Sequence, residues 1–318
     1  MRSMSPRALG LLMGFVADRL LGDPARFHPV AGFGRVAGAV EQRMYADSRS
    51  RGVLFTASLV GGTAALGLAV ERSLRDRPAL LATATATATW AVLGGTSLGR
   101  EATAVHAFLA TDDLPGARLR LTHLVGRDTS QLTENEVARA TIESVAENTS
   151  DAVTAPLVWG ALLGVPGLVG YRAANTLDAM VGHRNPRYER FGWASARWDD
   201  LLNLAGARLA ALLAAALAPS VGGSTRAALT AWHADARHHP SPNAGPIEAS
   251  FAGALGIQLG GVNRYGDRVE DRHTLGSGTP PQAADIDRAR VLADRVALGS
   301  VAVAALSAGA AGARRRAR

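Results

Sequence analysis

Four long stretches of the chain contain no charged residue, and this feature limits the possible folds more than any other; they cover residues 53–70, 79–99, 152–171 and 296–313. Uncharged, mainly apolar runs of about 18 or more residues are candidate transmembrane helices. Only 5% of the residues are aromatic, so the 47% hydrophobic fraction is mostly Ala, Leu and Val, a composition typical of helical proteins. We therefore expect an all-α fold, a polytopic membrane bundle of helices. Buried helices of a large soluble all-α protein are the alternative, because Ala, Gly and Thr make the runs weakly hydrophobic.

The run 152–171 is interrupted by the sequence GVPG at residues 164–167. Pro166 has no backbone N–H and the glycines favour a turn, so we predict a broken-helix hairpin with two arms of about twelve residues. A straight helix would place Glu147 and Arg172 about 30 Å apart, on opposite faces of a membrane. The hairpin instead returns both residues to one side, where one active site can use them.

Other local patterns predict further helices. Thr133 and Glu136 form a capping-box pattern at the start of a helix. In residues 83–89 threonine alternates with alanine, and we expect a helix whose threonines bond to carbonyls of the preceding turn. Gly256 and Gly260 form a GxxxG motif, which predicts close contact between helices. The remaining helices are expected at residues 8–22, 32–46, 53–72, 79–99, 198–219 and 296–313.

Two missing residue types and the distribution of charge exclude several functions. Cysteine and lysine do not occur, which excludes disulfides, zinc thiolate sites, thiol nucleophiles, Schiff bases and a Walker A loop. Much of the net charge of +7 comes from the terminal sequence RRRAR, which follows an uncharged helix. Such a tail is typical of a positive-inside anchor on anionic lipid, and no aromatic residues interleave with it, so nucleic acid is not an expected partner.

The first apolar run and the lack of linkers define the expected domain organisation. The run LGLLMGFVA, residues 9–17, meets Asp18 without a small-residue cleavage site, so we expect a retained first helix and not a signal peptide. No internal repeat or low-complexity linker interrupts the chain. Residues 1–318 are therefore expected to form a single integral membrane domain.

Three acids recur at four-residue spacing in ESVAENTSD, residues 143–151. Glu143, Glu147 and Asp151 fall on one helical face, where adjacent like charges destabilise the helix unless positive groups lie opposite. Asn148 lies beside the middle acid. The stretch therefore predicts a polar site that requires cationic partners.

Arg172, Asn175 and Asp178 are spaced i, i+3 and i+6, so cation, amide and acid share one helical face. A salt-bridge ladder on a helix surface is the simpler interpretation of such a triplet. Its position at the end of the apolar hairpin, opposite the acids of ESVAENTSD, favours a functional role.

Asp199, Asp200 and Asn203 form the motif DDxxN, in which Asp199 and Asn203 are one helical turn apart. Paired oxygen ligands on one helix face suit Mg²⁺, which keeps several waters and often bridges to substrate phosphates. The alternative is an exposed first turn of a helix, where the helix dipole favours acids.

Two loops hold polar side chains between prolines. The sequence HHPSPN places His239, Ser241 and Asn243 on a backbone stiffened by Pro240 and Pro242, and His28 lies in the similar sequence RFHPV. Such loops hold donors and acceptors in place without a helix. A single histidine is more often structural, so each loop alone is a weak indication of function.

Taken together, six motifs resemble the CbiB/CobD family of cobalamin biosynthesis, the adenosylcobinamide-phosphate synthases. They are LLGDPARFHPV, GRDT, ESVAENTSDAVTAPL, YRAANTLDAMVGH, ARWDDLLNLAGARL and HPSPNAGPIEASFAGALGIQLGG. The resemblance covers most of residues 10–262 in the family's motif order. The chain departs from the usual pattern at GPIEAS, which has one residue fewer, and such a change affects pocket shape.

The resemblance implies a polytopic enzyme of the inner membrane that joins adenosylcobyric acid to an aminoalcohol or its phosphate, using ATP and Mg²⁺. Amide formation needs a carboxylate oxygen turned into a leaving group, so a carboxyl phosphate made from ATP is the expected route. Mg²⁺ and arginines stabilise the charge that develops on the transferring phosphate. Attack requires the neutral amine, so a carboxylate or His239 must take a proton.

We expect these residues to line one cavity formed by the polar loops. The predicted catalytic residues are Glu147, Asp151, Asp178 and His239, and the predicted metal ligands are Asp199, Asp200 and Asn203. The predicted substrate- and phosphate-binding residues are Asp23, His28, Arg127, Asn148, Arg172, Asn175, Arg197, Arg208, Ser241 and Asn243.

Two rival functions use similar residues. A Mg²⁺-dependent membrane prenyl or alcohol-phosphate transferase usually has two comparable acid-rich motifs, and ESVAENTSD does not repeat DDLLN. An ion-coupled transporter also uses intramembrane acids but would more often show an internal repeat. ATP and cobyric acid are cytosolic and the basic tail favours a cytosolic C-terminus, so the cavity is expected to open to the cytoplasm.

Overall fold

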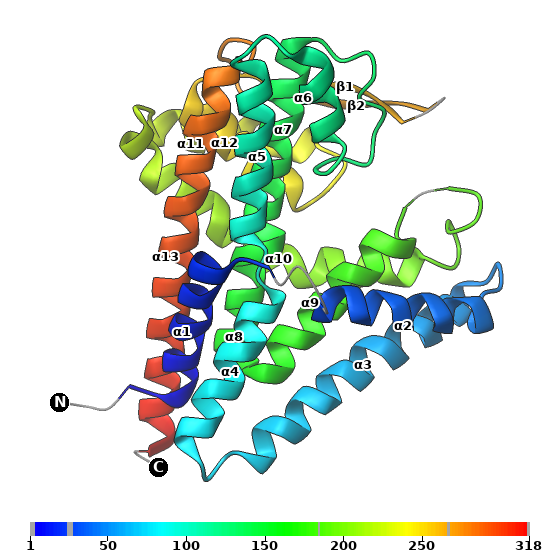
Figure 1. Cartoon of the computed structure of the whole chain (residues 1–318), viewed down its shortest axis with the longest axis vertical. Coiled ribbons are helices and arrows are strands. Elements are labelled where there is room, and N and C mark those ends of the chain that lie inside the picture. The colour runs from blue at the N-terminus through cyan, green and yellow to red at the C-terminus, as the bar shows by residue number, and fades with distance from the viewer. Residues whose placement is uncertain (1–3, 24–27, 184, 266–267, 317–318) are drawn as a thin grey trace. The chain divides into compact units, whose positions relative to one another are not determined.

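The computed structural model describes residues 4–23, 28–183, 185–265 and 268–316, and this part of the chain is mostly helical (Figure 1). The α-helices are α1 (Pro6–Leu21), α2 (Pro29–Met44), α3 (Arg49–Ser73), α4 (Pro78–Val92), α5 (Gly95–Leu109), α6 (Leu114–Leu121), α7 (Glu134–Thr149), α8 (Ala155–Leu163), α9 (Val165–Val181), α10 (Trp193–Leu217), α11 (Thr225–Asp235), α12 (Ala244–Leu255) and α13 (Ala283–Arg316). A π-helix, η1 (Ser150–Thr154), and two 3₁₀ turns, η2 (Ala218–Val221) and η3 (Ala236–His238), join some of them. The strands are β1 (Leu259–Tyr265) and β2 (Arg268–Leu275).

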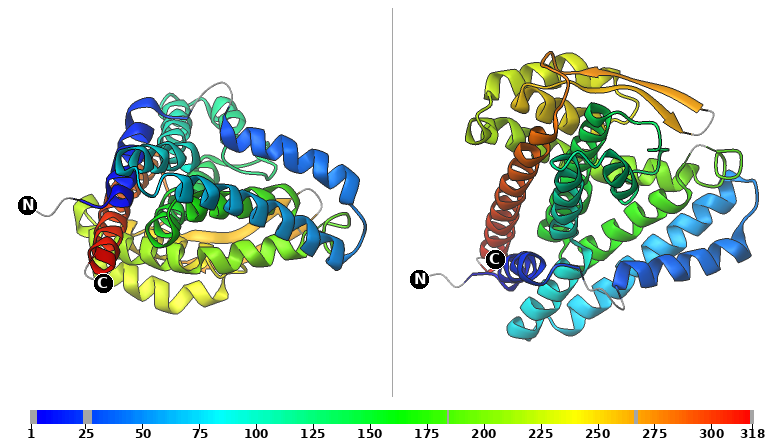
Figure 2. Two further views of the ribbon diagram at one scale, coloured as in Figure 1. Left: turned by 90° about the horizontal axis from the view of Figure 1, so that it is seen from below. Right: turned by 45° about the horizontal axis from the view of Figure 1, so that its top comes forward.

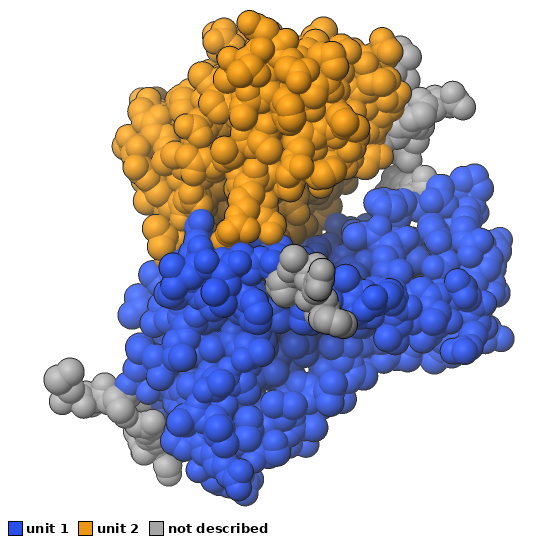
Figure 3. Space-filling model, viewed as in Figure 1, with its two compact units in different colours: residues 1–94, 155–203, 301–318 blue, residues 95–154, 204–300 orange. Residues whose placement is uncertain are grey.

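The chain forms two compact units, each assembled from segments that are separated in sequence (Figure 3). Unit 1 contains residues 1–94, 155–203 and 301–318, and unit 2 contains residues 95–154 and 204–300. The expectation of a single domain over residues 1–318 stays a prediction.

Unit 1 contains the predicted hairpin, and the break at GVPG is confirmed. The α8 helix ends at Leu163, Gly164 adopts a φ of 74°, and Pro166 lies in the first turn of α9. A left-handed φ favours glycine, which has no Cβ to clash. The two arms pack closely, since a Cβ on Gly167 would overlap the carbonyl oxygen of Trp159.

An ion pair from two other helices satisfies the backbone at this break. Arg7 of α1 donates to the carbonyl oxygens of Ala161 and Leu162, at 3.3 and 3.1 Å. Glu71 of α3 accepts from the Val165 N–H at 3.0 Å, and Arg7 and Glu71 bind each other at 2.7 Å. These contacts serve the free carbonyl and N–H groups that every interrupted helix leaves behind. The predicted proximity of Glu147 and Arg172 concerns residues of different units and stays a prediction.

The threonine-rich run is helical, as predicted, and packs against α1. Thr85 and Thr89 each bond to the carbonyl four residues earlier, at 2.8 Å. On α1, a Cβ at Gly10 would lie 2.7 Å from the Ala82 carbonyl oxygen, and one at Gly14 would lie 2.5 Å from that of Ala86. The small residues of α1 therefore allow the close helix contact typical of membrane bundles.

The prediction of one helix over residues 79–99 is wrong. The α4 helix ends at Val92, and Leu93 has extended backbone angles of −73° and 153°. Two glycines follow, Gly94 and Gly95, and α5 starts at the second of them. Glycine loses more conformational freedom in a helix than other residues, so the pair favours a break here.

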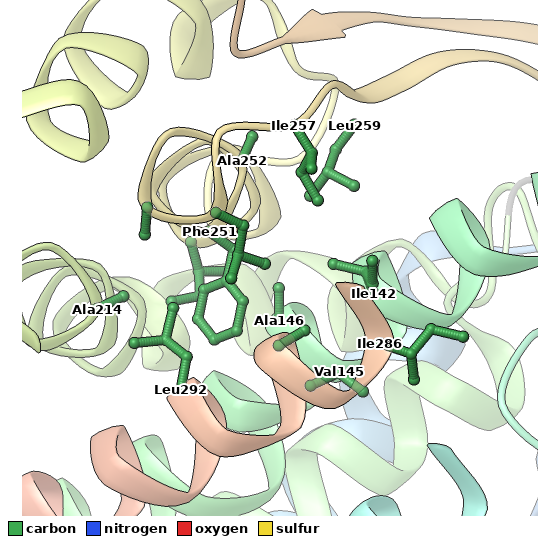
Figure 4. Close-up of a cluster of buried hydrophobic side chains, with 14 of the residues drawn as sticks. Ile142, Val145, Ala146, Ala214, Phe251, Ala252, Ile257, Leu259, Ile286 and Leu292 are labelled. Carbon is green, nitrogen blue, oxygen red and sulfur yellow. The ribbon is translucent and has the colours of Figure 1, made fainter. Parts of the chain in front are cut away.

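Unit 2 is built around α7, α10, α12 and α13, whose buried side chains form one core (Figure 4). The predicted capping box is confirmed, because the Thr133 hydroxyl accepts from the Glu136 N–H and the Glu136 carboxylate accepts from the Thr133 N–H. Ile142 and Val145 of α7 face Phe251 of α12 and Leu292 of α13 across this core. Packing one face of α7 in this way fixes the direction in which its acids point.

A β-hairpin completes unit 2, so the all-α expectation is wrong at this point. Strands β1 and β2 pair antiparallel, with an irregularity between Gly260 and Val262, and lie beside α11 and α12 in the right-hand view of Figure 2. The predicted GxxxG helix contact is also wrong. Gly256 ends α12 with a φ of 70°, and Gly260 lies in β1 with a φ of 74°. Both glycines serve left-handed backbone positions and not a helix surface.

Among the described residues, three helices are long and apolar enough to cross a membrane: Arg49–Ser73, Trp193–Val221 and Ala283–Gly312. The first and last contain most of the uncharged runs 53–70 and 296–313. The runs 79–99 and 152–171 are not among them, because each is broken into shorter helices. On α3, Leu54 and Leu66 are 54% and 67% exposed, as expected for side chains that face lipid. The three apolar helices indicate a membrane protein.

Candidate functional site

The predicted site residues form two groups, one in each unit. Unit 1 contains Asp23, His28, Arg172, Asn175, Asp178, Arg197, Asp199, Asp200 and Asn203. Unit 2 contains Arg127, Glu147, Asn148, Asp151, Arg208, His239, Ser241 and Asn243. The single cavity expected from the sequence would need both groups and stays a prediction.

In unit 1, polar side chains of α9 and α10 form a continuous chain of hydrogen bonds. Arg172 donates to Asn175 Oδ1 at 3.2 Å, and Asn175 Nδ2 donates to Asp199 Oδ1 at 3.3 Å. Asn203 Nδ2 donates to Asp199 Oδ2 at 3.0 Å, and Asn203 Oδ1 accepts from the Tyr171 hydroxyl at 2.7 Å. The i, i+3 and i, i+4 spacings predicted from the sequence therefore place these side chains in contact.

Asp199 is the centre of this unit 1 cluster. It is buried in the second turn of α10, 7% exposed, so the alternative of an exposed first turn does not apply to it. Asp178 of α9 lies close enough for its charge to act on Asp199. Asp200 instead points toward Arg197, 3.6 Å away, on a more exposed part of the helix.

The oxygen atoms around Asp199 are candidate ligands for Mg²⁺. Among the described residues, no three His, Asp or Glu side chains gather as ligands for a metal ion. Mg²⁺ needs fewer, since it is commonly held by one or two carboxylates together with waters and substrate phosphates. Each Asp199 oxygen accepts one amide hydrogen bond and keeps a further lone pair. Asp199 and its neighbour Asp178 fit such an ion, whereas the two hydrogen bonds of Asn203 suit it to orienting Asp199.

Two further predicted residues of unit 1, Asp23 and His28, belong to the segment between α1 and α2. His28 Nδ1 accepts from the Val30 N–H at 3.2 Å and so caps this helix. Asp23 follows Gly22, whose carbonyl oxygen accepts from Trp90 Nε1 at 2.9 Å. Pro24 of the predicted extended turn lies in residues 24–27, outside the described residues.

In unit 2, Glu143 is fully satisfied. Its Oε2 accepts from Arg127 Nη2 at 3.1 Å, and its Oε1 accepts from the Gly260 N–H at 2.8 Å and lies 3.8 Å from Arg139 Nε. Both side chains of the Arg127–Glu143 pair are almost completely buried. The two arginines are the cationic partners that the first acid of ESVAENTSD requires.

The next acid of the same face, Glu147, has no such partner. Within the described residues it makes no hydrogen bond or ion pair, although its side chain is only partly exposed. Burial of the carboxyl raises the pKa of Glu147, the Glu143 charge raises it further, and the charges of Arg272 and Arg127 oppose this effect. Arg272 lies on β2, so the hairpin brings a cation toward α7.

Glu248 of α12 faces the same group of charges. It is completely buried, and neither of its carboxyl oxygens has a hydrogen-bond partner among the described residues. His239 Nε2 lies 3.8 Å from its Oε2. Burial, followed by the charges of Glu143 and Glu147, raises the pKa of Glu248 well above its usual range, against the effect of Arg272 and Arg127.

The rigid loop HHPSPN holds His239 in one orientation. The Ser241 N–H donates to His239 Nδ1 at 3.1 Å, and the Ser241 carbonyl oxygen lies 3.2 Å from the same nitrogen. Because a backbone N–H can only donate, Nδ1 acts as the acceptor and the ring proton of the neutral imidazole is on Nε2, which faces Glu248. The Ser241 hydroxyl accepts from the N–H groups of Asn243 and Ala244, at 3.3 and 3.1 Å, and fixes the turn.

Two other predicted residues of unit 2 have defined contacts. Arg208 of α10 donates to Asn243 Oδ1 at 2.7 Å, which links this helix to the HHPSPN loop. Asn148 donates to the carbonyl oxygen and hydroxyl of Ser144, at 3.0 and 3.2 Å, on its own helix. Asn148 is therefore turned toward the preceding helical turn.

Sequence reasoning missed three residues of the unit 2 cluster: Arg139, Glu248 and Arg272. Glu248 had a detectable signal, because it is the only Asp, Glu or Arg between Arg237 and Arg264. An isolated acid in an apolar helix is costly to bury and so marks a site. Arg139 also had a signal, because it precedes Glu143 by four residues on the same helix. Arg272 had none, since it reaches the cluster only through the β-hairpin.

The family model for CobD/Cbib proteins matches residues 11–293 of the chain, a range that includes both polar clusters. The chain belongs to the CobD/CbiB family. Relatives in this family confirm the match over nearly the whole length. A protein of Mycobacterium tuberculosis strain H37Rv, named cobalamin biosynthesis protein CobD, is 51% identical over 300 residues, which covers 94% of this chain and 95% of the relative.

Two further CobD proteins match at lower identity and over slightly less of both chains. The cobalamin biosynthesis protein CobD of Chromobacterium violaceum is 45% identical over 91% of this chain and 92% of its own length. That of Rhodobacter capsulatus is 43% identical over 88% of each chain. No solved structure matches the chain.

Proposed function

We propose that the chain is an ATP-dependent amide ligase of cobalamin biosynthesis. It joins adenosylcobyric acid to (R)-1-amino-2-propanol O-phosphate, or a related aminoalcohol, and gives adenosylcobinamide phosphate. The observation that carries the proposal is the family match over residues 11–293, together with relatives that are named for cobalamin biosynthesis. The apolar helices support a membrane location. We assign the protein to the cytoplasmic membrane, with a site open to the cytoplasm, because ATP is present there.

The proposed reaction has two steps. A carboxylate oxygen of the corrinoid attacks the γ-phosphorus of ATP, which forms a carboxyl phosphate and releases ADP. The amine nitrogen then attacks the carboxyl carbon, a C–N bond forms, and inorganic phosphate leaves with the electron pair of the broken C–O bond. The nitrogen enters as an ammonium group and loses two protons. A protein carboxylate accepts the first before attack, and the leaving phosphate takes the second as the amide forms.

The two clusters suit different parts of this chemistry. In unit 1, Asp199 and Asp178 would hold Mg²⁺, which neutralises charge on the transferring phosphate when bound. Arg172 binds and orients Asn175 and, through it, Asp199. In unit 2, buried arginines and carboxyls of raised pKa suit phosphate binding and proton transfer, so we assign the amine to this cluster.

Product analysis tests the proposal. The full-length protein in detergent is incubated with adenosylcobyric acid, ATP, Mg²⁺ and 1-amino-2-propanol O-phosphate, and the products are identified by mass. The expected result is adenosylcobinamide phosphate with one ADP per amide. The exposed Asp76→Asn variant serves as a control that keeps full activity. A protein that consumes no ATP with all substrates present would refute the ligase, and phosphate-ester transfer without ATP would support the transferase instead.

A further inference from the structure

Glu248 is expected to destabilise the fold at its position. It lies in the middle of α12, is completely buried, and has neither carboxyl oxygen hydrogen-bonded among the described residues. An unpaired buried carboxyl destabilises a fold, because it loses its hydration without gaining a partner. A ligand that supplies the missing partner would explain why an acid is present here.

The charges around Glu248 are uneven. Glu143 is matched by Arg127, Arg139 and the Gly260 N–H. The other two carboxyls, Glu147 and Glu248, are faced by Arg272 and more weakly by the already paired Arg127. The arginines equal the carboxyls in number, but Arg127 and Arg139 lie against Glu143. Glu147 and Glu248 therefore share mainly the charge of Arg272, and neither oxygen of Glu248 accepts a hydrogen bond from a described residue.

His239 lies beside Glu248 but makes no hydrogen bond to it. In the neutral ring, Nδ1 accepts from the Ser241 N–H. The remaining ring proton, on Nε2, points toward Glu248 from 3.8 Å. His239 thus acts as a neutral group that orients one side of the Glu248 carboxyl and leaves the other oxygen to a second partner.

We propose that Glu147 and Glu248 form the binding site for a primary ammonium group. Glu147 is partly exposed and contacts the ammonium, and Glu248 lies behind it as the second carboxyl of the pair. The identification of the ligand as the aminoalcohol of the ligase rests on the proposed function. The ammonium site itself rests on the unpaired acids.

The same pair is suited to remove the first proton, which the ammonium group must lose before the nitrogen can attack. An ordinary alkylammonium and an ordinary glutamic acid differ by about six pKa units, so an exposed carboxylate is too weak a base. Burial raises the pKa of both Glu147 and Glu248 and narrows this difference. The proton passes from the ammonium nitrogen to a carboxylate oxygen of Glu147, and the nitrogen lone pair becomes available for attack.

Binding measurements with two ligands show how much the ammonium group contributes to affinity. The full-length protein in detergent is titrated calorimetrically with 1-amino-2-propanol O-phosphate and with the analogue that has a hydroxyl in place of the amine, both with adenosylcobyric acid and a non-hydrolysable ATP analogue present. The wild type is expected to bind the amine at least about tenfold more tightly than the hydroxyl analogue. Glu147→Gln and Glu248→Gln are expected to lose most of this preference.

Controls distinguish a binding role from a structural one. Glu134→Gln changes an exposed acid in the first turn of the same α7 helix and should keep the wild-type preference. Because Glu248 is completely buried, Glu147→Gln gives an independent reading if the other variant folds poorly. Unchanged preference in both variants, or no amine binding by the folded wild type, would overturn the proposal.

The outcomes also separate this inference from the ligase. If the protein prefers the amine but forms no amide with ATP, the ammonium site is supported and the proposed ligase function is refuted. If the protein forms the amide but Glu147→Gln and Glu248→Gln leave KM for the amine unchanged, the ligase function is supported and the ammonium site is refuted.

Discussion

The carboxylates of the two units differ in the number of hydrogen bonds that they accept. In unit 1, both oxygens of Asp199 accept amide hydrogen bonds, and the amides are themselves held by Arg172 and Tyr171. In unit 2, Glu147 and Glu248 have no hydrogen bonds among the described residues. A carboxylate with one hydrogen bond to each oxygen is fixed in place and keeps lone pairs for a ligand of defined geometry. A carboxylate without hydrogen bonds gains its partner only when a ligand arrives.

The largest effect is expected from removing the acids of unit 1. The double variant Asp199→Ala, Asp200→Ala should lose all measurable amide formation, because it removes the main candidate ligand for Mg²⁺ and leaves two amide donors unsatisfied. The amount of protein in the membrane fraction should be unchanged, which cell fractionation measures. Normal turnover by this variant would show that the DDxxN motif is structural.

In unit 2, replacing Glu147 should affect the rate more than the fold. Glu147→Gln is expected to lower kcat by about 10²- to 10⁴-fold, the usual contribution of a positioned acid or base. Single-turnover kinetics with preformed ternary complex measure the chemical step directly. A kcat within a factor of about three of wild type would remove Glu147 from the proton transfer.

Charge-removing variants should change stability in opposite directions in the two units. Asp199→Asn places an amide where Asn175 and Asn203 need an acceptor, so we expect a loss of about 1–3 kcal/mol in the free energy of unfolding. Thermal unfolding in one detergent measures it, with the more exposed Asp200→Asn as the matched control, expected within about 1 kcal/mol of wild type. Equal stability of Asp199→Asn and wild type would contradict the saturated network.

The smallest effect is a pH dependence of stability at Glu248. Its pKa is raised in the folded protein, so the stability it contributes is fully present below the unfolded pKa near 4.3 and is lost as pH rises toward the folded value. Glu248→Gln removes this titration, so its Tm relative to wild type should increase steadily from about pH 5 upward. Melting curves of both proteins across this range give the difference. A constant or falling difference would mean that Glu248 is ionised and paired in the native state.

The features predicted correctly from the sequence depend on chemistry within a few residues. Pro166 between glycines specifies a helix break, Thr133 with Glu136 specifies a helix start, and Thr85 bonds within its own helix. Each follows from backbone donors, acceptors and allowed angles, which do not need tertiary context.

The features that were missed depend on contacts between distant residues. Glu143 bonds to Gly260, 117 positions further along the chain, and this contact joins the β-hairpin to α7. The letters of GxxxG are the same for a helix surface and for two left-handed glycines, so the motif alone could not distinguish them. The acids of ESVAENTSD were identified as needing partners, but Arg272 and Glu248 are brought to them only by the fold. Arg139 could have been identified from its i, i+4 spacing to Glu143.

Both members of the ion pair at the α8–α9 break are synthesised before the break that they stabilise. Arg7 and Glu71 belong to helices that leave the ribosome before Gly164 does, because synthesis runs from the N-terminus. The partners for the free carbonyl and N–H groups of the break are therefore already synthesised when the hairpin emerges. The free backbone groups of the break can be paired as soon as the hairpin forms, without waiting for helices that are synthesised later.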